Sequence, residues 1–352
     1  MPSGGPVPGD GAAQPRGITV LGELVVDLLP DPTGDPGPEG TAPRYIARPG
    51  GNALNVAVAA GRLGAPVELR ARLGTGPLAA NLRRHAELSG VDVRGFVPAA
   101  EPVSLAVVGL RGDGSADYGF HVLGAADWQW RDEDLADVVP ATTAILHIGS
   151  ISSWTAPGSE AIARLAERLH ASGCLISLDP NIRPMLAEGP VGTSLGNHRT
   201  AVRTRLERLW AVADIVKISS EDLAWLEPDH PADADGLDAA VQRWTALGPA
   251  LTLLTDGGEP LRVGRPGRPV QRFQPPPVTV ADTVGAGDSL AAGLLSGLLS
   301  AGVTSRPELE ALDDPGLGAV LGDAVLVAAL TCGRTGADPP TAAELDAARS
   351  VR

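Results

Sequence analysis

The order of strand-like and helix-like segments along this chain restricts it to a small group of folds. Residues 17–30 form an apolar run rich in β-branched side chains and ended by a proline, which is typical of a buried strand. Residues 52–65 follow with apolar positions at helical spacing, and a glycine near their end suits a helix C-terminus. The same order recurs in 67–90 and in 142–181. Because strands joined by helices run parallel in one sheet, this order predicts an α/β fold.

One stretch, residues 103–130, breaks the alternation. Two β-prone segments there flank the turn-forming sequence RGDGSA, which predicts an antiparallel hairpin outside the parallel sheet. The alternation then resumes, and a last helical region is predicted from Gly285 to the end of the chain. The sequence has no repeat with a period of about 20 to 50 residues, which excludes solenoids and propellers.

The composition is that of a soluble globular protein. Hydrophobic residues make up 43% of the chain, and no uninterrupted apolar run reaches the roughly 18 residues of a membrane span. A formal net charge of −14 argues against binding to nucleic acid, which needs clustered Lys and Arg. The two cysteines lie far apart and the six histidines form no metal motif, so we expect a cytoplasmic protein without structural zinc. Residues 1–16 lack the features of a signal peptide and are expected to form a disordered tail.

The most informative motif is DTVGAGDSLAAGLLSGLL, residues 282–299. Gly285, Ala286 and Gly287 directly precede an apolar helical run, so the first backbone N–H groups of that helix are unobstructed. A helix start of this kind carries about half a positive charge and suits a phosphate or a developing oxyanion. Asp288 lies in the first turn, where a carboxylate can accept a proton from an attacking hydroxyl. The alternative interpretation is that Asp288 only caps the helix and the glycines only allow close packing.

Other motifs, present or absent, narrow the class of enzyme to which the chain can belong. Lys217 is the only lysine, no GxxxxGK[ST] is present, and HRD and DFG are absent, which excludes a P-loop enzyme and a protein kinase. Residues 74–79, GTGPLA, fit a dinucleotide-binding fingerprint, but Asp92 is the only acid near the required offset, so the signal is weak. Trp128 and Trp130 are expected to pack in the core, in preference to bordering a ligand.

Two segments resemble the signatures of one enzyme family. Residues 282–299 are similar to the C-terminal signature of the ribokinase-like (PfkB) carbohydrate kinases, and residues 50–64, GGNALNVAVAAGRLG, to their N-terminal signature. Both occur in the expected order. The resemblance implies a three-layer α/β/α sandwich with a mostly parallel central sheet and a small β lid. It also implies one kinase domain over 17–345, with lid segments at about 28–49 and 103–121.

Within that family the chain looks most like fructokinases and related bacterial sugar kinases, on the segments GELVVDLLP, AADW, LDPNIRP and VKISSEDL. The resemblance implies ATP- and magnesium-dependent transfer of phosphate to a sugar hydroxyl. Asp288 then corresponds to the base, and Gly285, Ala286 and Gly287 to the anion hole. The positions that resemble sugar ligands are Asp27, Gly50, Gly51 and Asn55. A strand-end carboxylate and a helix-start amide also suit the paired hydrogen bonds of a vicinal diol.

The segment LDPNIRP has the form of the family's DxNxR motif at the end of a predicted strand. The resemblance implies that Asp179 and Asn181 bind the substrate. It brings Arg183 to the transferring phosphoryl group, where a planar guanidinium matches equatorial oxygens. The alternative is a purely structural ion pair between Asp179 and Arg183.

The resemblance also assigns nucleotide and cation positions. Those that resemble nucleotide-binding residues are Lys217, Ser219, Thr255 and Gly257. Those that resemble cation sites are Asp222 for magnesium and Asp282 for potassium. Three departures stand out: SSED replaces the family's NxxE, Pro260 replaces the last glycine of TxGxxG, and GTGPLA lacks the aspartate of GxDxxG.

Several functions are compatible with these residues. The partners implied are a small sugar and ATP, without nucleic acid or membrane, and with a homodimer formed through the lid. A nucleoside kinase of the same fold is one alternative. A 2-keto-3-deoxygluconate kinase is a second, in which Arg183 or a lid arginine would meet the substrate carboxylate. The third is a catalytically silent sugar-binding regulatory protein, which the three departures favour and the intact Asp288 opposes.

Overall fold

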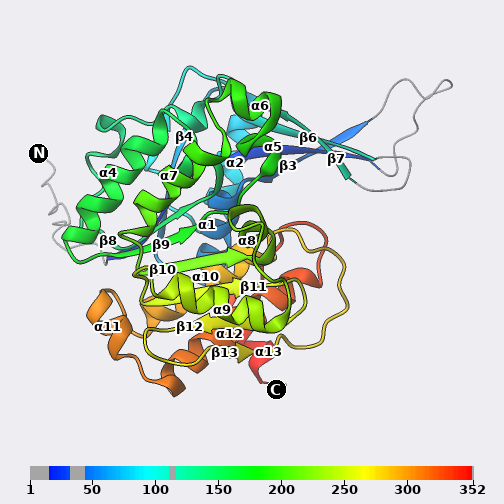
Figure 1. Cartoon of the computed structure of the whole chain (residues 1–352). Helices are drawn as coiled ribbons and strands as arrows, with labels where there is room; N and C mark the ends of the chain where they lie inside the picture. Colours follow the sequence, from blue (N-terminus) through cyan, green and yellow to red (C-terminus); the bar gives the residue numbers. More distant parts are fainter. Residues whose placement is uncertain (1–15, 32–43, 111–115, 351–352) are drawn as a thin grey trace, which may run out of the picture.

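The computed structural model describes residues 16–31, 44–110 and 116–350, and the expected N-terminal tail lies outside them. Its largest element is a nine-stranded sheet in the order β13-β12-β11-β10-β9-β8-β1-β4-β5 (Figure 1). The strands are β1 (Gly17–Leu21), β4 (Val67–Leu73), β5 (Phe96–Pro98), β8 (Thr143–Gly149), β9 (Leu175–Asp179), β10 (Ile215–Ser219), β11 (Leu251–Thr255), β12 (Leu261–Gly264) and β13 (Gln271–Phe273).

The strands of this sheet run parallel from β5 to β11, and only β12 and β13 pair antiparallel. The central strands β1, β8 and β9 are buried along their whole length. Continuous apolar strands are stable only when helices cover both faces of the sheet, as the sequence order predicts. A parallel sheet also brings the carboxyl ends of its strands to one edge, which is where ligands bind in folds of this kind.

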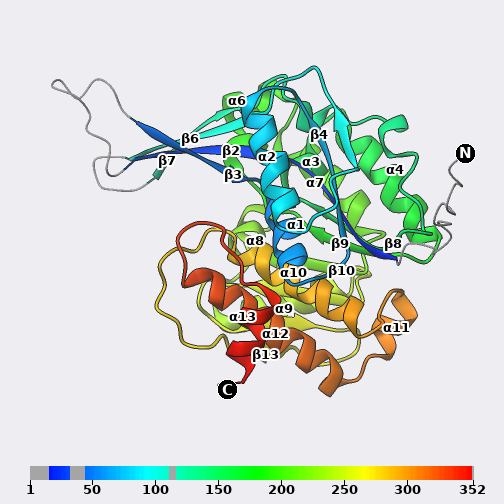
Figure 2. The same ribbon diagram turned by 180° about the vertical axis from the view of Figure 1, so that it is seen from behind.

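Helices cover both faces, which confirms the predicted three layers. On one face, which Figure 2 views, α1, α2, α10 and α12 share an apolar core with the sheet. On the other face, which Figure 1 views, α4, α7 and α9 share a second core. Their bounds are α1 (Asn52–Arg62), α2 (Pro77–Leu88), α4 (Gly158–Ala171), α7 (Arg199–Trp210), α9 (Ala234–Thr245), α10 (Ala286–Ser300) and α12 (Asp314–Cys332). The shorter helices are α3 (Ser150–Trp154), α5 (Pro184–Ala187), α6 (Gly189–Ser194), α8 (Ser220–Leu226), α11 (Arg306–Ala311), α13 (Ala342–Arg349), η1 (Ala126–Trp128) and η2 (Glu133–Leu135).

A second sheet of four strands, in the order β3-β2-β6-β7, forms the lid and projects from the body (Figure 1). Its strands are β2 (Val25–Pro30), β3 (Tyr45–Gly50), β6 (Ser104–Leu110) and β7 (Ala116–His121). The pairing of β6 with β7 is antiparallel, which confirms the predicted hairpin. Strand β1 ends at Leu21 and β2 begins at Val25, while β3 ends directly before α1. The lid is therefore rooted at the carboxyl edge of the main sheet.

Helix α12 is the one helix among the described residues that is long and apolar enough to cross a membrane by length and composition. In this fold it packs along α10 in the first core. The two helices approach so closely that a Cβ at Gly293 would lie 2.9 Å from Cα of Ala324. A Cβ at Gly297 would lie 2.9 Å from a methyl group of Val320. These contacts give α12 the role of a core helix of a globular protein.

This close approach yields a test of the packing. Gly293→Ala should lower the free energy of unfolding by about 1 kcal/mol or more, because the new methyl group meets backbone and overpacking costs about 1 to 3 kcal/mol. Gly322→Ala, in the neighbouring helix, meets open space and should raise stability by roughly 0.5 to 1 kcal/mol through helix propensity. Urea unfolding of both variants decides the matter. Equal stability of the two variants would show that α10 and α12 are not in close contact.

Candidate active site

Asp288 lies in the first turn of α10, and its carboxylate bonds to side chains of α1, the helix that follows lid strand β3. Gly285 caps this helix in the left-handed conformation, with φ of 77°, which favours glycine. A Cβ at Gly287 would lie 3.0 Å from Nζ of Lys217, so the glycine leaves room for the ammonium group. The N–H of Ala286 donates to the carbonyl oxygen of Thr283 at 3.2 Å. The helix start still carries its partial positive charge, with a carboxylate and a cation beside it, an arrangement that suits an anion.

Two amides of α1 hold the Asp288 carboxylate. Nδ2 of Asn52 donates to Oδ1 of Asp288 at 2.7 Å, and Nδ2 of Asn55 donates to Oδ2 at 2.8 Å. These positions are three residues apart and lie on one helix face, so both side chains reach the same group. The sequence interpretation named Asn55 but missed Asn52. The sequence did contain a signal for Asn52, because two asparagines at this spacing in the first turn of one helix place their amides on the same face.

Burial raises the pKa of Asp288 above its ordinary value, and the nearby charge of Asp179 adds to the effect. The Asn55 and Asn52 amides and the Lys217 ammonium oppose this increase in pKa, since each favours the ionised form. A raised pKa brings a carboxylate nearer to the operating pH, which improves it as a general base.

Lys217 and Asp179 form a buried ion pair beneath Asp288. Nζ of Lys217 lies 2.8 Å from Oδ2 of Asp179, and Asp179 is fully buried. Nδ2 of Asn52 is also 3.5 Å from the same Asp179 oxygen. Burial alone would lower the pKa of Lys217, but the charges of Asp179, Asp222 and Asp288 raise it overall. The ammonium group therefore stays charged, and it balances the carboxylates around it.

The structural alternative for LDPNIRP, an Asp179–Arg183 ion pair, is not formed. Arg183 is exposed and donates instead to Oδ1 of Asn181 at 2.6 Å. Asn181 has a positive φ of 38°, which turns the chain at the end of β9. Arg183 is thus left at the mouth of the site, where its guanidinium can meet another group.

On the lid side, Asp27 and two glycines face the site. A Cβ at Gly50 would lie 2.2 Å from Oδ2 of Asp27, and a Cβ at Gly51 would lie 2.6 Å from the carbonyl oxygen of Glu23. At Gly51 a side chain would meet backbone and the φ of 104° favours glycine, whereas at Gly50 it would displace the Asp27 carboxylate. Burial raises the pKa of Asp27 to about 6, against the opposing charge of Arg183. The lid carboxylate and the Arg183 guanidinium therefore lie near each other across the site.

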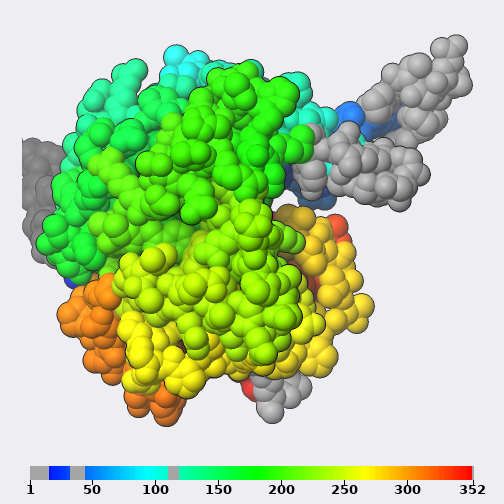
Figure 3. All heavy atoms as spheres, in the orientation of Figure 1, coloured from blue at the N-terminus to red at the C-terminus, as the bar shows by residue number. Residues whose placement is uncertain are grey.

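The predicted nucleotide residues lie at the same edge of the sheet. Ser219 and Thr255 are direct neighbours in the ladder between β10 and β11. Gly257 follows in a turn with φ of 53°. In Figure 3 the surface is indented between the lid and the C-terminal half of the chain.

The two predicted cation positions already bind backbone. Asp222 accepts the backbone N–H of Ile182 at 2.6 Å with one oxygen and caps α8 through Ser219 with the other. Asp282 accepts the N–H of Val284 at 3.1 Å and that of Gly336 at 2.8 Å. No group of three His, Cys, Asp or Glu side chains suited to a metal occurs among the described residues. The roles of Asp222 and Asp282 toward cations stay predictions.

Two buried acceptors at the site have no hydrogen-bond partner, Oδ1 of Asp179 and Oδ1 of Asn52, and the carboxylate oxygen is compatible with a cation. Burial and the charge of Asp179 raise the pKa of Asp222 nearby. Magnesium in phosphotransferases is commonly bound by one or two carboxylates together with substrate phosphates, so a complete protein cage is not required. The residues present fit such a shared site.

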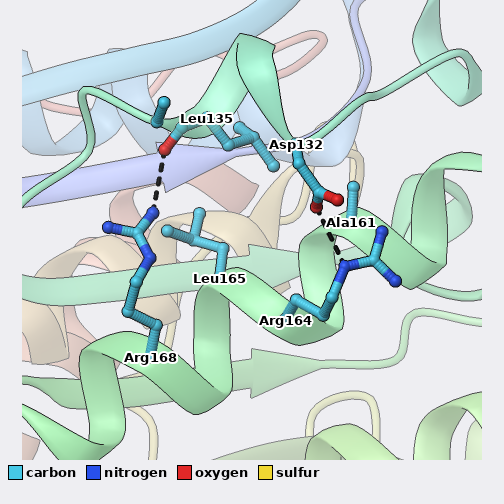
Figure 4. A pocket seen from close by; sticks show the side chains of 7 residues that line it. Asp132, Leu135, Ala161, Arg164, Leu165 and Arg168 are labelled. Carbon is cyan, nitrogen blue, oxygen red and sulfur yellow. Dashed lines mark hydrogen bonds and ion pairs between the residues drawn. The ribbon is translucent and has the colours of Figure 1, made fainter.

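Other features lie outside this constellation. Trp128 and Trp130 are buried in the second core, as predicted. A surface groove of about 370 Å³ between η2 and α4 is lined by none of the site residues. Figure 4 shows its two arginines already engaged: Arg164 with the Asp132 carboxylate and Arg168 with the carbonyl oxygen of Leu135. This groove therefore offers no free charged group for a ligand.

The geometry defines a class of enzyme. A buried carboxylate at a helix N-terminus, beside a cation and under a lid with its own carboxylate, is suited to phosphoryl transfer onto a small hydroxyl compound. A profile of the pfkB family of carbohydrate kinases matches residues 16–343. The chain belongs to this family, and it is a carbohydrate kinase that transfers phosphate from ATP to a sugar hydroxyl.

Individual relatives agree with this assignment. The chain is 34% identical to a fructokinase from Klebsiella pneumoniae over 81% of its own length and 85% of that protein. It is also 34% identical to a fructokinase from Rhizobium leguminosarum bv. trifolii, covering 85% of each. A crystal structure of fructokinase from Xylella fastidiosa with bound ATP matches with a TM-score of 0.80 and 28% identity, over 95% of this chain and 98% of that one.

The buried ion pair gives a prediction for the pH dependence. Lys217→Met removes a charge that favours ionised Asp288, so the pKa of Asp288 should rise further and the acidic limb of the kcat profile should move to higher pH. Stability should fall by about 3 to 5 kcal/mol, because Asp179 is left buried without its partner.

The double variant Lys217→Met, Asp179→Asn supplies the control. It removes both charges, which act on the pKa of Asp288 in opposite directions, so the limb should return toward that of the unaltered enzyme. Part of the lost stability should return as well. An acidic limb that stays in place in the single variant would show that Lys217 does not act on Asp288.

Proposed function

We propose that this enzyme is a fructokinase, which transfers the γ-phosphoryl group of ATP to a hydroxyl of D-fructose. The observation that carries the proposal is the alignment of most of the chain with fructokinases, in which Asn55 bonds to Asp288 and Asp27 lies on lid strand β2 within reach of the charge of Arg183. Carboxylate and amide groups on opposite walls suit a ligand that presents several hydroxyls.

In this mechanism, Asp288 accepts the proton of the attacking hydroxyl as the bond to phosphorus forms. Its amide partners, Asn52 and Asn55, orient the carboxylate and are near enough to exchange that contact for sugar hydroxyls. The N–H groups of Gly285, Ala286 and Gly287 would stabilise the oxygens of the phosphoryl group through the helix N-terminus, that of Ala286 by exchanging its bond to the Thr283 carbonyl oxygen.

Arg183 and Lys217 supply positive charge from two sides. Arg183 is exposed and linked only to polar atoms of its own loop, so it can turn toward the phosphoryl oxygens. Lys217 is fixed by Asp179 and contributes its charge from beneath the helix start. Closure of the lid would exclude water, since hydrolysis of ATP is the competing reaction.

The nucleotide is proposed to lie along β10 and β11, near Ser219, Thr255 and Gly257. Magnesium, held by Asp222 and the unpaired Asp179 oxygen together with the phosphates, would neutralise phosphate charge. Potassium at Asp282 stays a prediction, and no step is assigned to it. A homodimer through the lid also stays a prediction, to which the exposed Tyr45 and Ile46 on edge strand β3 are relevant.

The substrate is tested by a coupled assay of ADP release over hexoses, pentoses, 2-keto-3-deoxy sugar acids and nucleosides. We expect the highest kcat/KM with fructose, since the described site offers hydroxyl-binding groups on both walls. A higher kcat/KM for a keto-deoxy acid or for a nucleoside would replace fructose as the assigned substrate. No turnover with any acceptor would support the catalytically silent alternative.

The role of Asp288 is tested by Asp288→Asn, which keeps the size of the side chain and removes its ability to take a proton. General-base catalysis contributes about 10²- to 10⁴-fold, so kcat should fall by at least roughly two orders of magnitude. Nucleotide affinity should hardly change, because the backbone N–H groups remain in place.

The same variant separates catalysis from helix capping. A capping role predicts turnover close to normal and a stability loss of about 1 kcal/mol or less, because Asn caps nearly as well as Asp. Measurement of kcat, ATP affinity and melting temperature on this variant distinguishes the two. Near-normal turnover would rule out Asp288 as the base.

A further inference from the structure

A cluster of buried polar groups lies where the lid leaves the body, outside the site described above. It consists of Glu23, Leu24, Ser104, Asp127 and Ser152, which we call the lid root. Glu23 and Leu24 connect β1 to β2, Ser104 begins β6, Asp127 belongs to η1 and Ser152 to α3. Glu23 and Asp127 are each only 1% exposed. The lid root therefore joins segments that are far apart in the sequence, and solvent does not reach its carboxyl groups.

Asp127 holds the beginnings of two lid strands at once. Its Oδ1 accepts the backbone N–H of Leu24 at 2.9 Å, directly before β2. Its Oδ2 accepts the hydroxyl of Ser104 at 2.6 Å, at the first residue of β6. These strands pair in parallel, and Asp27 lies three residues after Leu24 on β2. The position of Asp127 therefore fixes the point from which the strand carrying Asp27 starts.

Glu23 anchors the same point to the body. One of its oxygens accepts the N–H of Ser152 at 3.1 Å and the hydroxyl of Ser152 at 2.9 Å. The carbonyl oxygen of Glu23 packs so closely against Gly51 that a Cβ there would lie 2.6 Å away. Since Gly51 caps α1, the lid root also contacts the helix start that carries the amides of the active site.

The lid root is energetically costly, which argues that it has a function. Neither carboxyl group forms an ion pair with an Arg or Lys among the residues that the structure describes. Burial raises the pKa of Asp127 to about 7, and the charge of Glu23 adds to this. Burial raises the pKa of Glu23 as well. Packed apolar residues at this place would avoid the cost of desolvating two acids. Hydrogen bonds, unlike apolar contacts, are directional, so those from Leu24 and Ser104 to Asp127 fix the orientation of the lid strands where they begin.

We propose that Asp127 is a positioning residue for the sugar: by holding Leu24 and Ser104, it sets where the lid strands leave the body and so where Asp27 lies opposite Asp288. This inference rests on the proposed function, in which Asp27 binds the acceptor. Asp127 itself touches neither substrate. Its effect is on the geometry of the wall that the lid contributes.

The test compares Asp127→Ala, Asp127→Asn and Asp27→Ala in the coupled assay with fructose. Asp127→Ala should raise KM for fructose roughly tenfold, because the donors of Leu24 and Ser104 lose their acceptor and the lid strands shift. KM for ATP should stay unchanged, since the nucleotide residues lie on β10 and β11. Asp27→Ala should raise KM for fructose in the same way and serves as the reference. Asp127→Asn should retain a KM within about threefold of the unaltered enzyme, because an amide can accept from Leu24 and donate to Ser104.

A matched control separates positioning from general stability. Asp214 is also a buried carboxylate, and it accepts the backbone N–H of Ile176 at 2.9 Å at the opposite end of the sheet. Asp214→Ala should lower the melting temperature without changing KM for fructose. If Asp127→Ala does not fold, Ser104→Ala removes one of the two lid contacts and should raise KM for fructose by a smaller factor.

Three results would overturn the inference: an unchanged KM for fructose in a folded Asp127→Ala or Ser104→Ala variant, an equal increase in KM for fructose and for ATP, or an increase in the Asp214→Ala control. Turnover by the unaltered enzyme in the same assay identifies a failure of the proposed function separately. If the substrate screen favours another sugar, the same comparison is made with that sugar, and the expected split between the two KM values is unchanged.

Discussion

The hydrogen bonds from Asn52 and Asn55 to Asp288 join the two helix starts on which the active site depends. One helix follows the lid in the sequence, and the other lies in the C-terminal half of the chain. A buried carboxylate needs such donors, since an unpaired charge in the interior is very costly. The same two bonds fix the direction of the carboxylate. The hydrogen bonds between residues 50–64 and residues 282–299 therefore contribute to the stability of the fold and, in the proposed mechanism, to catalysis.

Charge balance sets the second constraint. Asp179, Asp222 and Asp288 are all buried near one another, and Lys217 is the only lysine in the sequence. Each acid without a partner would be driven toward its neutral form. The Lys217 ammonium group favours the ionised form of these carboxylates. Gly287, which has no side chain, leaves the space that this ammonium group occupies. The unpaired oxygen of Asp179 shows that the protein alone does not satisfy the whole cluster, which is consistent with a site that is completed by its ligands.

The lid adds a wall whose orientation depends on its root. Asp27, the residue proposed to face the acceptor, lies on β2, and the chain is held just before this strand by the contact of Leu24 with Asp127. Leu24 lies only three residues before Asp27, so a change in its contact with Asp127 acts on the strand close to Asp27. On the inference drawn for Asp127, such groups position the lid wall without touching the substrate.

The sequence by itself determined the parallel α/β body, the lid hairpin, the helix that begins after Gly285 and the identity of Asp288 as the candidate base. These features follow from local patterns: apolar periodicity, turn residues and a glycine-rich helix start. The tertiary structure alone decided that Asp179 pairs with Lys217 and not with Arg183, that Asn52 shares Asp288 with Asn55, and that Asp127 holds the lid. These contacts join residues from different strands and helices. Their formation depends on the distance between side chains in the folded chain. The spacing of Asn52 and Asn55 places their two amides together, but it does not show which distant group they meet.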